Sequence, residues 1–533
     1  MSIDAIIISD SGSDSLSVTN PLKLKIDSRI ADIQIVQNFL TNAGQVGLPI
    51  EGDGLMSWAS APKLNGIYLF NYLIKHNFTV ELIDNFHNEK DRFKRSLTRH
   101  PRTVIISTTF IPGKQSLGKL VADIRVLAPD VFIIVGGPLL YLSYLMLKRS
   151  REPEYDTQSA KNEFLFLEVK NEPAVDLYII SLRGEQVMCD VLDSIRENKG
   201  VAGIPNSARL IGNTYHFTRR IDDITGSEDF PIDWLALPDA IFKSGVVPMQ
   251  ASTGCPYQCA FCNFTKDRRL TWIKPVERMV AEMKAVKKRG ARYVWFVDDN
   301  FRLGKGNLDA VCRRFVDESL DLKWMTFIRA GTLENVDLEL LRHAGCIEVQ
   351  LGLESADPQI LKNMNKKASP ELYNKVLKRL LSAGINCSCY FIFGFPGETE
   401  ESAQRTRDFI KTHDYQQYEG NLSWSMFPFI LAPLSPIYEP EARKKYGISG
   451  YLYKWQHATM NSDQARDQVV KTFFEIENSG PIYRGDNQNI FRYTGPFVRK
   501  KFEAARHNLS KAALKGRLDK QETIQVFSKV LSE

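Results

Sequence analysis

The N-terminal part of the chain alternates short, almost uninterrupted apolar runs with amphipathic stretches. Residues 66–76 and 117–127 have the apolar spacing of helices, and a further helix is expected after Arg183-Gly184-Glu185. Buried strands separated by helices indicate a parallel sheet that is covered on both faces. We therefore expect a doubly wound α/β domain over residues 1–197, with its ligand site at the carboxyl ends of the strands. The five predicted strands are residues 5–9, 78–84, 103–107, 131–135 and 175–180.

The alternation resumes in the second half of the chain with a longer rhythm. Residues 198–241 are poorer in periodic signal and rich in glycine and proline, so they are predicted to form a connector. Residues 242–440 contain six successive strand–helix units, which predicts a partial (β/α)6 barrel with its site at the strand carboxyl ends. Residues 441–533 are predicted to form a mostly helical C-terminal domain. The six predicted barrel strands are residues 246–251, 293–297, 324–328, 347–351, 387–393 and 422–427.

The composition is that of a soluble globular protein, with 43% hydrophobic and 25% charged residues. The net charge of +6 is small for 533 residues, so bulk charge does not predict a nucleic-acid partner. The first ten residues include Asp4 and Asp10 and no basic residue, which is unlike a signal or transit peptide. The uncharged run at residues 131–147 is shorter than the ~20 residues of a membrane span and is interrupted by Gly136-Gly137-Pro138. We therefore expect a cytoplasmic protein without a membrane partner.

Three of the eight cysteines form the segment Cys255-Pro-Tyr-Gln-Cys259-Ala-Phe-Cys262, directly after a predicted strand. A disulfide framework is not expected in a cytosolic chain of this size. Thiolates at this spacing bind soft metals and iron–sulfur clusters. Zinc is the alternative, but it needs a fourth ligand, and the flanking histidines, His216 and His343, are far away along the chain. Three cysteines also leave one iron of a four-iron cluster open, which indicates a reactive cluster.

This three-cysteine loop, with an aromatic residue before its last cysteine, resembles that of the radical S-adenosylmethionine (SAM) superfamily. The resemblance covers roughly residues 246–438. It implies that Cys255, Cys259 and Cys262 ligate a [4Fe–4S] cluster and that SAM fills the fourth iron site. In such enzymes an external one-electron reductant, of the flavodoxin or ferredoxin type, reduces the cluster. The cluster then cleaves SAM to a 5′-deoxyadenosyl radical, while the protein orients the cofactors and excludes water.

The same resemblance places SAM contacts at polar and glycine positions just after predicted strands. Each position also has a plainer interpretation, because a strand end can carry a helix cap, a surface carboxylate or an ordinary turn. By resemblance, residues 298–300 face the methionyl amino group, Glu354-Ser355 face the ribose or carboxylate, and the turn at residues 394–397 lies near the adenine. The expected SAM contacts are Phe261, Asp298, Asp299, Asn300, Arg329, Glu354, Ser355 and Gly394.

The N-terminal domain resembles the cobalamin-binding domain of cobalamin-dependent radical SAM enzymes. The pattern P-x-L-x-G-I-x-L-x-x-x-L at residues 62–73 and the Val135-Gly136-Gly137-Pro138 turn carry this likeness. The D-x-H-x-x-G motif that supplies a lower histidine ligand is missing, since residues 10–65 contain no histidine. The resemblance therefore implies cobalamin without histidine ligation, and a generic doubly wound sheet is the alternative. The expected contacts are Ser107, Thr108, Gly136, Gly137 and Glu185.

Together these features predict a cobalamin-dependent radical SAM methyltransferase that acts on a carbon of a small-molecule or peptide substrate. Two alternatives stay open: the same cofactors used for cyclisation, ring contraction or oxidation, and an iron–sulfur regulatory protein without turnover. In the C-terminal region, the segment from Trp455 through His457 to Met460 resembles a W-x-H-x-T-M segment of such methyltransferases. It is expected on the substrate side of the barrel, with simple packing as the alternative.

Overall fold

The computed structural model describes residues 3–12, 25–26, 29–30, 61–221, 231–264, 272–302, 308–412, 416–482, 496–515 and 520–532. The chain divides into two compact units. Unit 1 is Met1–Ser17 with Pro62–Leu237, and unit 2 is Val18–Ala61 with Pro238–Glu533. In the described part of the chain, every helix is too short or too polar to cross a membrane.

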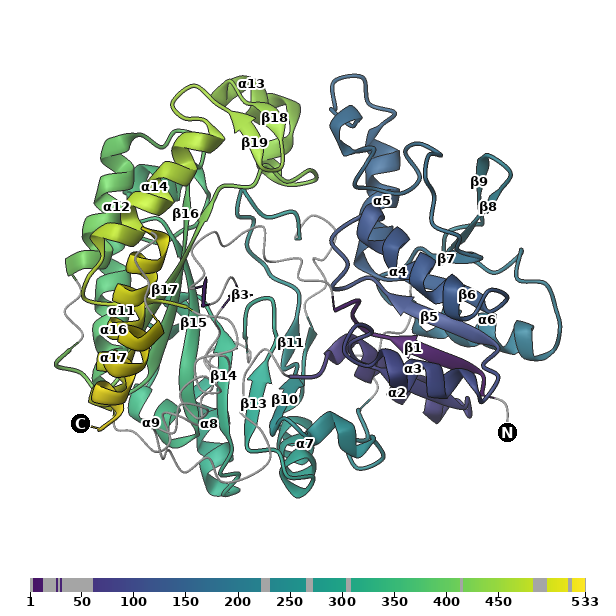
Figure 1. The fold of residues 1–533 in the computed structure, drawn as a ribbon, viewed down its shortest axis with the longest axis horizontal. Helices are drawn as coiled ribbons and strands as arrows, with labels where there is room; N and C mark the ends of the chain where they lie inside the picture. Colours follow the sequence, from purple (N-terminus) through teal and green to yellow (C-terminus); the bar gives the residue numbers. More distant parts are fainter. Residues whose placement is uncertain are drawn as a thin grey trace. The chain divides into compact units, whose positions relative to one another are not determined.

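Unit 1 contains the predicted doubly wound sheet (Figure 1). Its five parallel strands have the order β4-β1-β5-β6-β7. The strand that follows β1 along the chain, β4, pairs with one side of β1, and the next strand, β5, pairs with the other side of β1. The switch point between β1 and β5 is where open α/β sheets bind ligands. The strands are β1 (Ala5–Ile8), β4 (Val80–Ile83), β5 (Thr103–Ser107), β6 (Phe132–Gly136) and β7 (Leu177–Ile179).

The helices of unit 1 follow the strands of the sheet in turn. The uncharged run at residues 131–147 is the buried strand β6, a turn at Gly137 and a helix that begins at Pro138, as predicted. Gly137 has φ 108°, a conformation that favours glycine. The helices are α2 (Leu64–Lys75), α3 (Lys90–Leu97), α4 (Lys114–Leu127), α5 (Pro138–Arg149) and α6 (Glu185–Arg196).

The segment expected to be a connector contains two strands of the same sheet. β8 (Ser207–Ile211) pairs antiparallel with β7, and β9 (Thr214–Phe217) pairs antiparallel with β8. The hairpin packs through aromatic residues, since the ring centroids of Tyr215 and Phe166 lie 4.9 Å apart. In β9 only Tyr215 and Phe217 alternate as apolar positions, and a pattern this short does not by itself predict a strand.

Unit 2 contains the predicted parallel sheet with its strands in chain order, from β10 through β13, β14, β15 and β16 to β17 (Figure 1). A short strand, β20 (Gly480–Pro481), extends it beyond β17. The six main strands are β10 (Val246–Met249), β13 (Tyr293–Phe296), β14 (Lys323–Phe327), β15 (Cys346–Glu354), β16 (Asn386–Phe393) and β17 (Leu422–Pro428). The helices between them are α7 (Val276–Lys288), α8 (Leu308–Asp317), α9 (Leu338–His343), α10 (Pro358–Asn363), α11 (Pro370–Ser382) and α12 (Glu400–Thr412).

The C-terminal part of unit 2 is mostly helical, as expected, but it also carries a hairpin. The hairpin is β18 (Ser449–Tyr451) with β19 (Lys454–Gln456), between two of the helices. The helices are α13 (Pro440–Tyr446), α14 (Ser462–Glu475), α16 (Pro496–Leu514) and α17 (Lys520–Ser532).

Two short antiparallel strand pairs lie outside the C-terminal part. They are β2 (Lys25–Ile26) with β3 (Arg29–Ile30) and β11 (Ser252–Thr253) with β12 (Trp272–Ile273).

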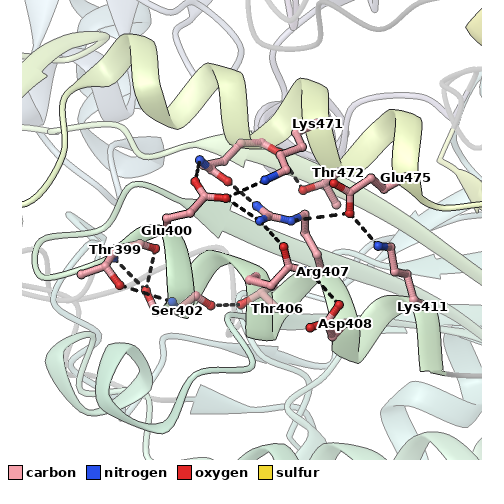
Figure 2. A network of polar contacts seen from close by, with 12 residues as sticks. Thr399, Glu400, Ser402, Thr406, Arg407, Asp408, Lys411, Lys471, Thr472 and Glu475 are labelled. Carbon is pink, nitrogen blue, oxygen red and sulfur yellow. Dashed lines mark hydrogen bonds and ion pairs between the residues drawn. The ribbon is translucent and has the colours of Figure 1, made fainter.

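A buried arginine joins α14 to the barrel helix α12 (Figure 2). The Arg407 side chain is fully buried and donates to Glu400 at 2.7 Å, to Gln404 at 2.6 Å and to Gln468 of α14. Lys471 of α14 reaches the same Glu400 carboxylate at 2.7 Å. These contacts fasten the C-terminal part of the chain to the outside of the barrel.

Candidate active site

The three cysteines of the predicted cluster lie in a loop that follows β10 and β11, at the carboxyl end of the first barrel strand. All eight cysteines are free thiols. Burial raises the pKa of Cys255 and raises that of Cys262 to about 11. These side chains are therefore thiols at neutral pH until a metal centre displaces their protons.

The Cys259 thiol lies close enough to Cys255 and Cys262 to interact with both electrostatically. Among the residues that the structure describes, no group of three or more His, Cys, Asp or Glu side chains is arranged to hold a metal ion. Three cysteines from one loop are a donor set that suits an iron–sulfur cluster, because each thiolate can bind a different iron atom, whereas a structural zinc site needs four ligands around one ion.

The cysteine loop is held by the segment that follows α10. The backbone N–H of Ala260 donates to the carbonyl of Met364 at 2.8 Å. The side-chain amide of Asn365 donates to the carbonyl of Gln258 at 2.7 Å. On its other side, the loop receives a hydrogen bond of 2.9 Å from the N–H of Ile437 to the Ala260 carbonyl. The middle of the loop is therefore fixed from two distant parts of the chain.

Arg329, the predicted residue after β14, contacts the cysteine loop directly. Its Nη1 lies 3.4 Å from the Sγ of Cys259, and its guanidinium carbon lies 3.8 Å from the centre of the Tyr257 ring. Its Nη2 donates to the carbonyl oxygen of Lys366. The sequence placed Arg329 at this strand end, but nothing in its pattern indicated that the side chain would reach a cysteine.

Asp298 and Asp299 accept hydrogen bonds from the backbone of the residues that lead into the cysteine loop. The Asp298 carboxylate accepts hydrogen bonds from the backbone N–H groups of Ala251 and Ser252 and from the Ser252 hydroxyl, which is 2.6 Å away. Burial raises the pKa of Asp298 to about 7. Asp299 accepts from the N–H of Gly254 at 3.1 Å. Both side chains thus act on the protein's own backbone next to Cys255.

Asn300 follows Asp298 and Asp299 in the sequence, and its side chain has no hydrogen-bond partner among the described residues. It is only 4% exposed, and neither its amide nitrogen nor its carbonyl oxygen has a hydrogen-bond partner in the described part of the chain. Buried amides are normally paired. Asn300 therefore offers one donor and one acceptor to a bound molecule, in keeping with its predicted role beside SAM.

Glu354, the predicted residue at the end of β15, forms a buried ion pair with a lysine that the sequence did not single out. The Nζ of Lys366 lies 2.8 Å from the Glu354 carboxylate, and both side chains are largely buried. Lys366 also lies 5.8 Å from the centre of the Phe261 ring. Glu354 has φ 67°, an uncommon conformation for a non-glycine residue that recurs at functional sites.

Ser355 serves the structure of the same strand end. Its hydroxyl lies 3.2 Å from the hydroxyl of Thr406 and accepts from the N–H of Asp357 at 3.1 Å. Asp357 is in turn the N-cap of α10.

The sequence did not indicate a role for Lys366, because this residue lies in an ordinary lysine pair, Lys366-Lys367, with no motif around it.

The turn after β16 is tightly enclosed. Gly394 has φ 87°, and a side chain there would meet Ala465 at 2.5 Å and Trp455 at 2.6 Å. The ring of Phe395 contacts that of Phe261 edge to face, with centroids 6.5 Å apart. The Glu398 carboxyl group accepts from the N–H of Gly394, and burial raises its pKa to about 8. The turn therefore reaches the last aromatic residue of the cysteine loop.

In unit 1, the predicted residues gather at the carboxyl ends of β5 and β6. Thr108 donates to the Gly136 carbonyl at 2.9 Å, and a side chain at Gly137 would meet the Thr108 hydroxyl at 2.9 Å. Asn65, which the sequence analysis missed, donates to the Ser9 carbonyl at 3.0 Å and to the Ser107 hydroxyl at 2.7 Å. Glu185 is the first residue of α6, the helix that follows β7.

The sequence of the barrel matches a known family. Residues 249–410 match the model described as the radical SAM superfamily. These residues therefore form a radical SAM domain. Such a domain implies a [4Fe–4S] cluster and SAM.

Two curated relatives are methyltransferases by name. An uncharacterized methyltransferase of Pyrococcus horikoshii is 26% identical over 54% of this chain and 60% of its own length. The bacteriochlorophyllide d C-12(1)-methyltransferase of Chlorobaculum tepidum is 32% identical over 46% of this chain and 54% of its own length. The radical SAM chain thus spans little more than half the length of these relatives.

A solved structure shares the fold over most of both chains. It is that of the radical S-adenosylmethionine methyltransferase TsrM from Kitasatospora setae, with cobalamin and a [4Fe–4S] cluster bound. The TM-score is 0.54, with 15% identity over 82% of this chain and 77% of that chain. The likeness confirms the α/β architecture of a Rossmann-like part followed by a radical SAM part.

Proposed function

We propose that this radical SAM protein is a cobalamin-dependent methyltransferase that acts on a carbon atom of a small-molecule or peptide substrate. The observation that carries the proposal is the cysteine loop at the strand ends of unit 2, in a chain whose unit 1 has the ligand-binding switch point of a doubly wound sheet. The methyltransferase names of the two relatives and the cofactors of the TsrM structure support it.

The residues around the cysteine loop suit SAM as well as a cluster. When bound, the reduced cluster supplies the electron that cleaves SAM, and cobalamin supplies the methyl group that is transferred. Cys255, Cys259 and Cys262 would hold three irons. Asn300 offers unpaired hydrogen-bonding atoms, and the Glu354 carboxylate is an acceptor that Lys366 keeps in place. Phe261 provides an apolar ring face for the adenine.

The switch point of unit 1 also fits a bound cofactor. The Oδ1 atom of Asn65 is buried and has no partner among the described residues. The amide nitrogen of the same side chain donates hydrogen bonds to residues at the ends of β1 and β5. A buried acceptor without a partner is uncommon in proteins and is expected where a bound ligand supplies the donor. Ser107, Thr108, Gly136 and Gly137 line the adjacent strand ends, so these residues would hold the cobalamin, with Glu185 at the start of α6.

The proposed activity is tested by an anaerobic incubation of reconstituted protein with SAM, cobalamin and a one-electron reductant of the flavodoxin or ferredoxin type. The proposal expects both 5′-deoxyadenosine and S-adenosylhomocysteine, because one SAM is cleaved and another gives up its methyl group. Formation of 5′-deoxyadenosine without any S-adenosylhomocysteine would instead support cyclisation, ring contraction or oxidation. The mass of the product decides in the same way, since methylation adds one CH2 unit.

The proposal includes a cytoplasmic location and no nucleic-acid or membrane partner. The absence of SAM cleavage in protein that holds a full cluster would favour the third possibility, an iron–sulfur regulatory protein. A cysteine-loop variant such as Cys262→Ala is the matched control, because it removes the cluster and leaves unit 1 unchanged.

A further inference from the structure

The guanidinium group of Arg329 is fixed in place by three different partners. One edge faces the Cys259 sulfur, with 3.4 Å between Nη1 and Sγ. One flat face lies on the Tyr257 ring at 3.8 Å. The remaining nitrogen donates to the Lys366 carbonyl. These three contacts fix the planar guanidinium group with one N–H group directed at the sulfur. The Arg329 side chain therefore loses little further entropy when it donates a hydrogen bond to Cys259.

We propose that Arg329 raises the reduction potential of the iron–sulfur cluster by donating a charge-assisted hydrogen bond to the Cys259 thiolate. This inference rests on the proposed function only in so far as the loop holds a cluster. Reduction adds one electron to the cluster, and no bond forms or breaks. Part of the added charge falls on the thiolate sulfurs, so a cationic donor stabilises the reduced state more than the oxidised state. Hydrogen bonds to the sulfurs are among the features that set cluster potentials.

The surroundings of this contact keep its effect large. Cys259 is only 7% exposed, so little water screens the charge on Arg329. The lysine whose carbonyl binds the guanidinium is itself paired with Glu354 at 2.8 Å, so its charge is neutralised locally. Arg329 is therefore a positioning and tuning residue for the electron transfer, and it need not touch SAM to act.

The test is a redox titration of the reconstituted full-length protein without substrate. The spectroscopic signal of the reduced cluster monitors the titration. Arg329→Gln removes the positive charge and the guanidinium. Arg379→Gln is the matched control, because Arg379 is also a partly buried arginine of unit 2 but binds the carbonyls of Leu333, Glu334 and Val336. Both variants lose one positive charge, and only the first loses the donor to sulfur.

We expect Arg329→Gln to lower the ratio of reduced to oxidised cluster at a fixed potential by about tenfold, which corresponds to about 59 mV for one electron. Arg329→Lys, which keeps the charge, should fall between the wild type and Arg329→Gln. Arg379→Gln should titrate like the wild type. Equal midpoints for Arg329→Gln, Arg379→Gln and the wild type, at equal iron content, would overturn the proposal.

Cluster loading separates this inference from the proposed function. If neither Arg329 variant holds a cluster while the wild type does, Arg329 is a structural support of the loop and the tuning role is rejected. If the wild type itself holds no cluster, the proposed function fails first. If the wild type is loaded and its midpoint is unaffected by Arg329→Gln, only the tuning role fails.

Discussion

The Nε2 atom of His457 donates a hydrogen bond of 3.1 Å to the carbonyl oxygen of Gly394. The His457 ring is stacked on the Trp455 ring, with centroids 5.2 Å apart, and the Trp455 indole in turn donates to the Phe429 carbonyl at 2.8 Å. The Trp-His segment expected on the substrate side of the barrel therefore holds the turn after β16. Through that turn, the C-terminal part of the chain acts on the aromatic end of the cysteine loop.

Replacing His457 should loosen this turn. In His457→Ala the buried Gly394 carbonyl loses its donor, which costs about 1–3 kcal/mol. We expect weaker binding of SAM, measured by equilibrium dialysis, together with a lower unfolding temperature. His457→Asn can still donate and should recover part of both losses. Unchanged SAM affinity in His457→Ala would show that the turn does not take part in SAM binding.

Removing the buried arginine of Figure 2 should separate α14 from α12. Arg407→Ala removes the hydrogen bonds that the buried guanidinium donates to Glu400 and Gln468. The loss of a hydrogen bond to a charged group costs about 1.5–3 kcal/mol, and Glu400 keeps its pair with Lys471. We expect a marked fall in the midpoint of urea unfolding of unit 2. The control is Lys375→Ala, which breaks an exposed pair with Glu334 and should cost less than about 1 kcal/mol. Similar midpoints for the two variants would contradict the role given to Arg407.

The Glu354–Lys366 pair should behave as a unit. Lys366→Met leaves a buried carboxylate uncompensated, so we expect a large loss of stability, and Glu354→Gln leaves an uncompensated ammonium group in the same way. The double variant Glu354→Gln/Lys366→Met should be more stable than Lys366→Met and should still bind SAM poorly, because the negatively charged carboxylate is gone. Thermal unfolding and SAM binding measured on the same samples check both parts. Additive losses of stability would show that the two residues do not interact.

The buried His507 should make the protein sensitive to acid. Burial lowers the pKa of His507 to about 4, below the value of about 6.5 in an unfolded chain. Between these values the unfolded state binds more protons, so stability falls as the pH is lowered. From pH 7 to pH 5 the loss from this group is about 2 kcal/mol. Urea unfolding of His507→Gln at both pH values should show a loss smaller by that amount, and an identical loss would refute it.

The strands and helices of both sheets could be predicted because their apolar patterns are local. The β8–β9 hairpin could not, since aromatic contacts such as that between Tyr215 and Phe166 stabilise it. The cysteine loop was found from spacing alone. The pairing of Lys366 with Glu354 and the contact of Arg329 with Cys259 depend on folding, because these residues are distant in sequence and have no motif of their own.

The most direct test of the account is the iron and sulfide content of anaerobically reconstituted protein. We predict about four irons and four sulfides per chain. Replacing Cys255, Cys259 and Cys262 together by alanine should remove them, whereas Cys387→Ala, a buried barrel cysteine outside the loop, should leave them in place. A wild-type protein that holds one zinc ion, or only traces of iron and sulfide, would contradict the account.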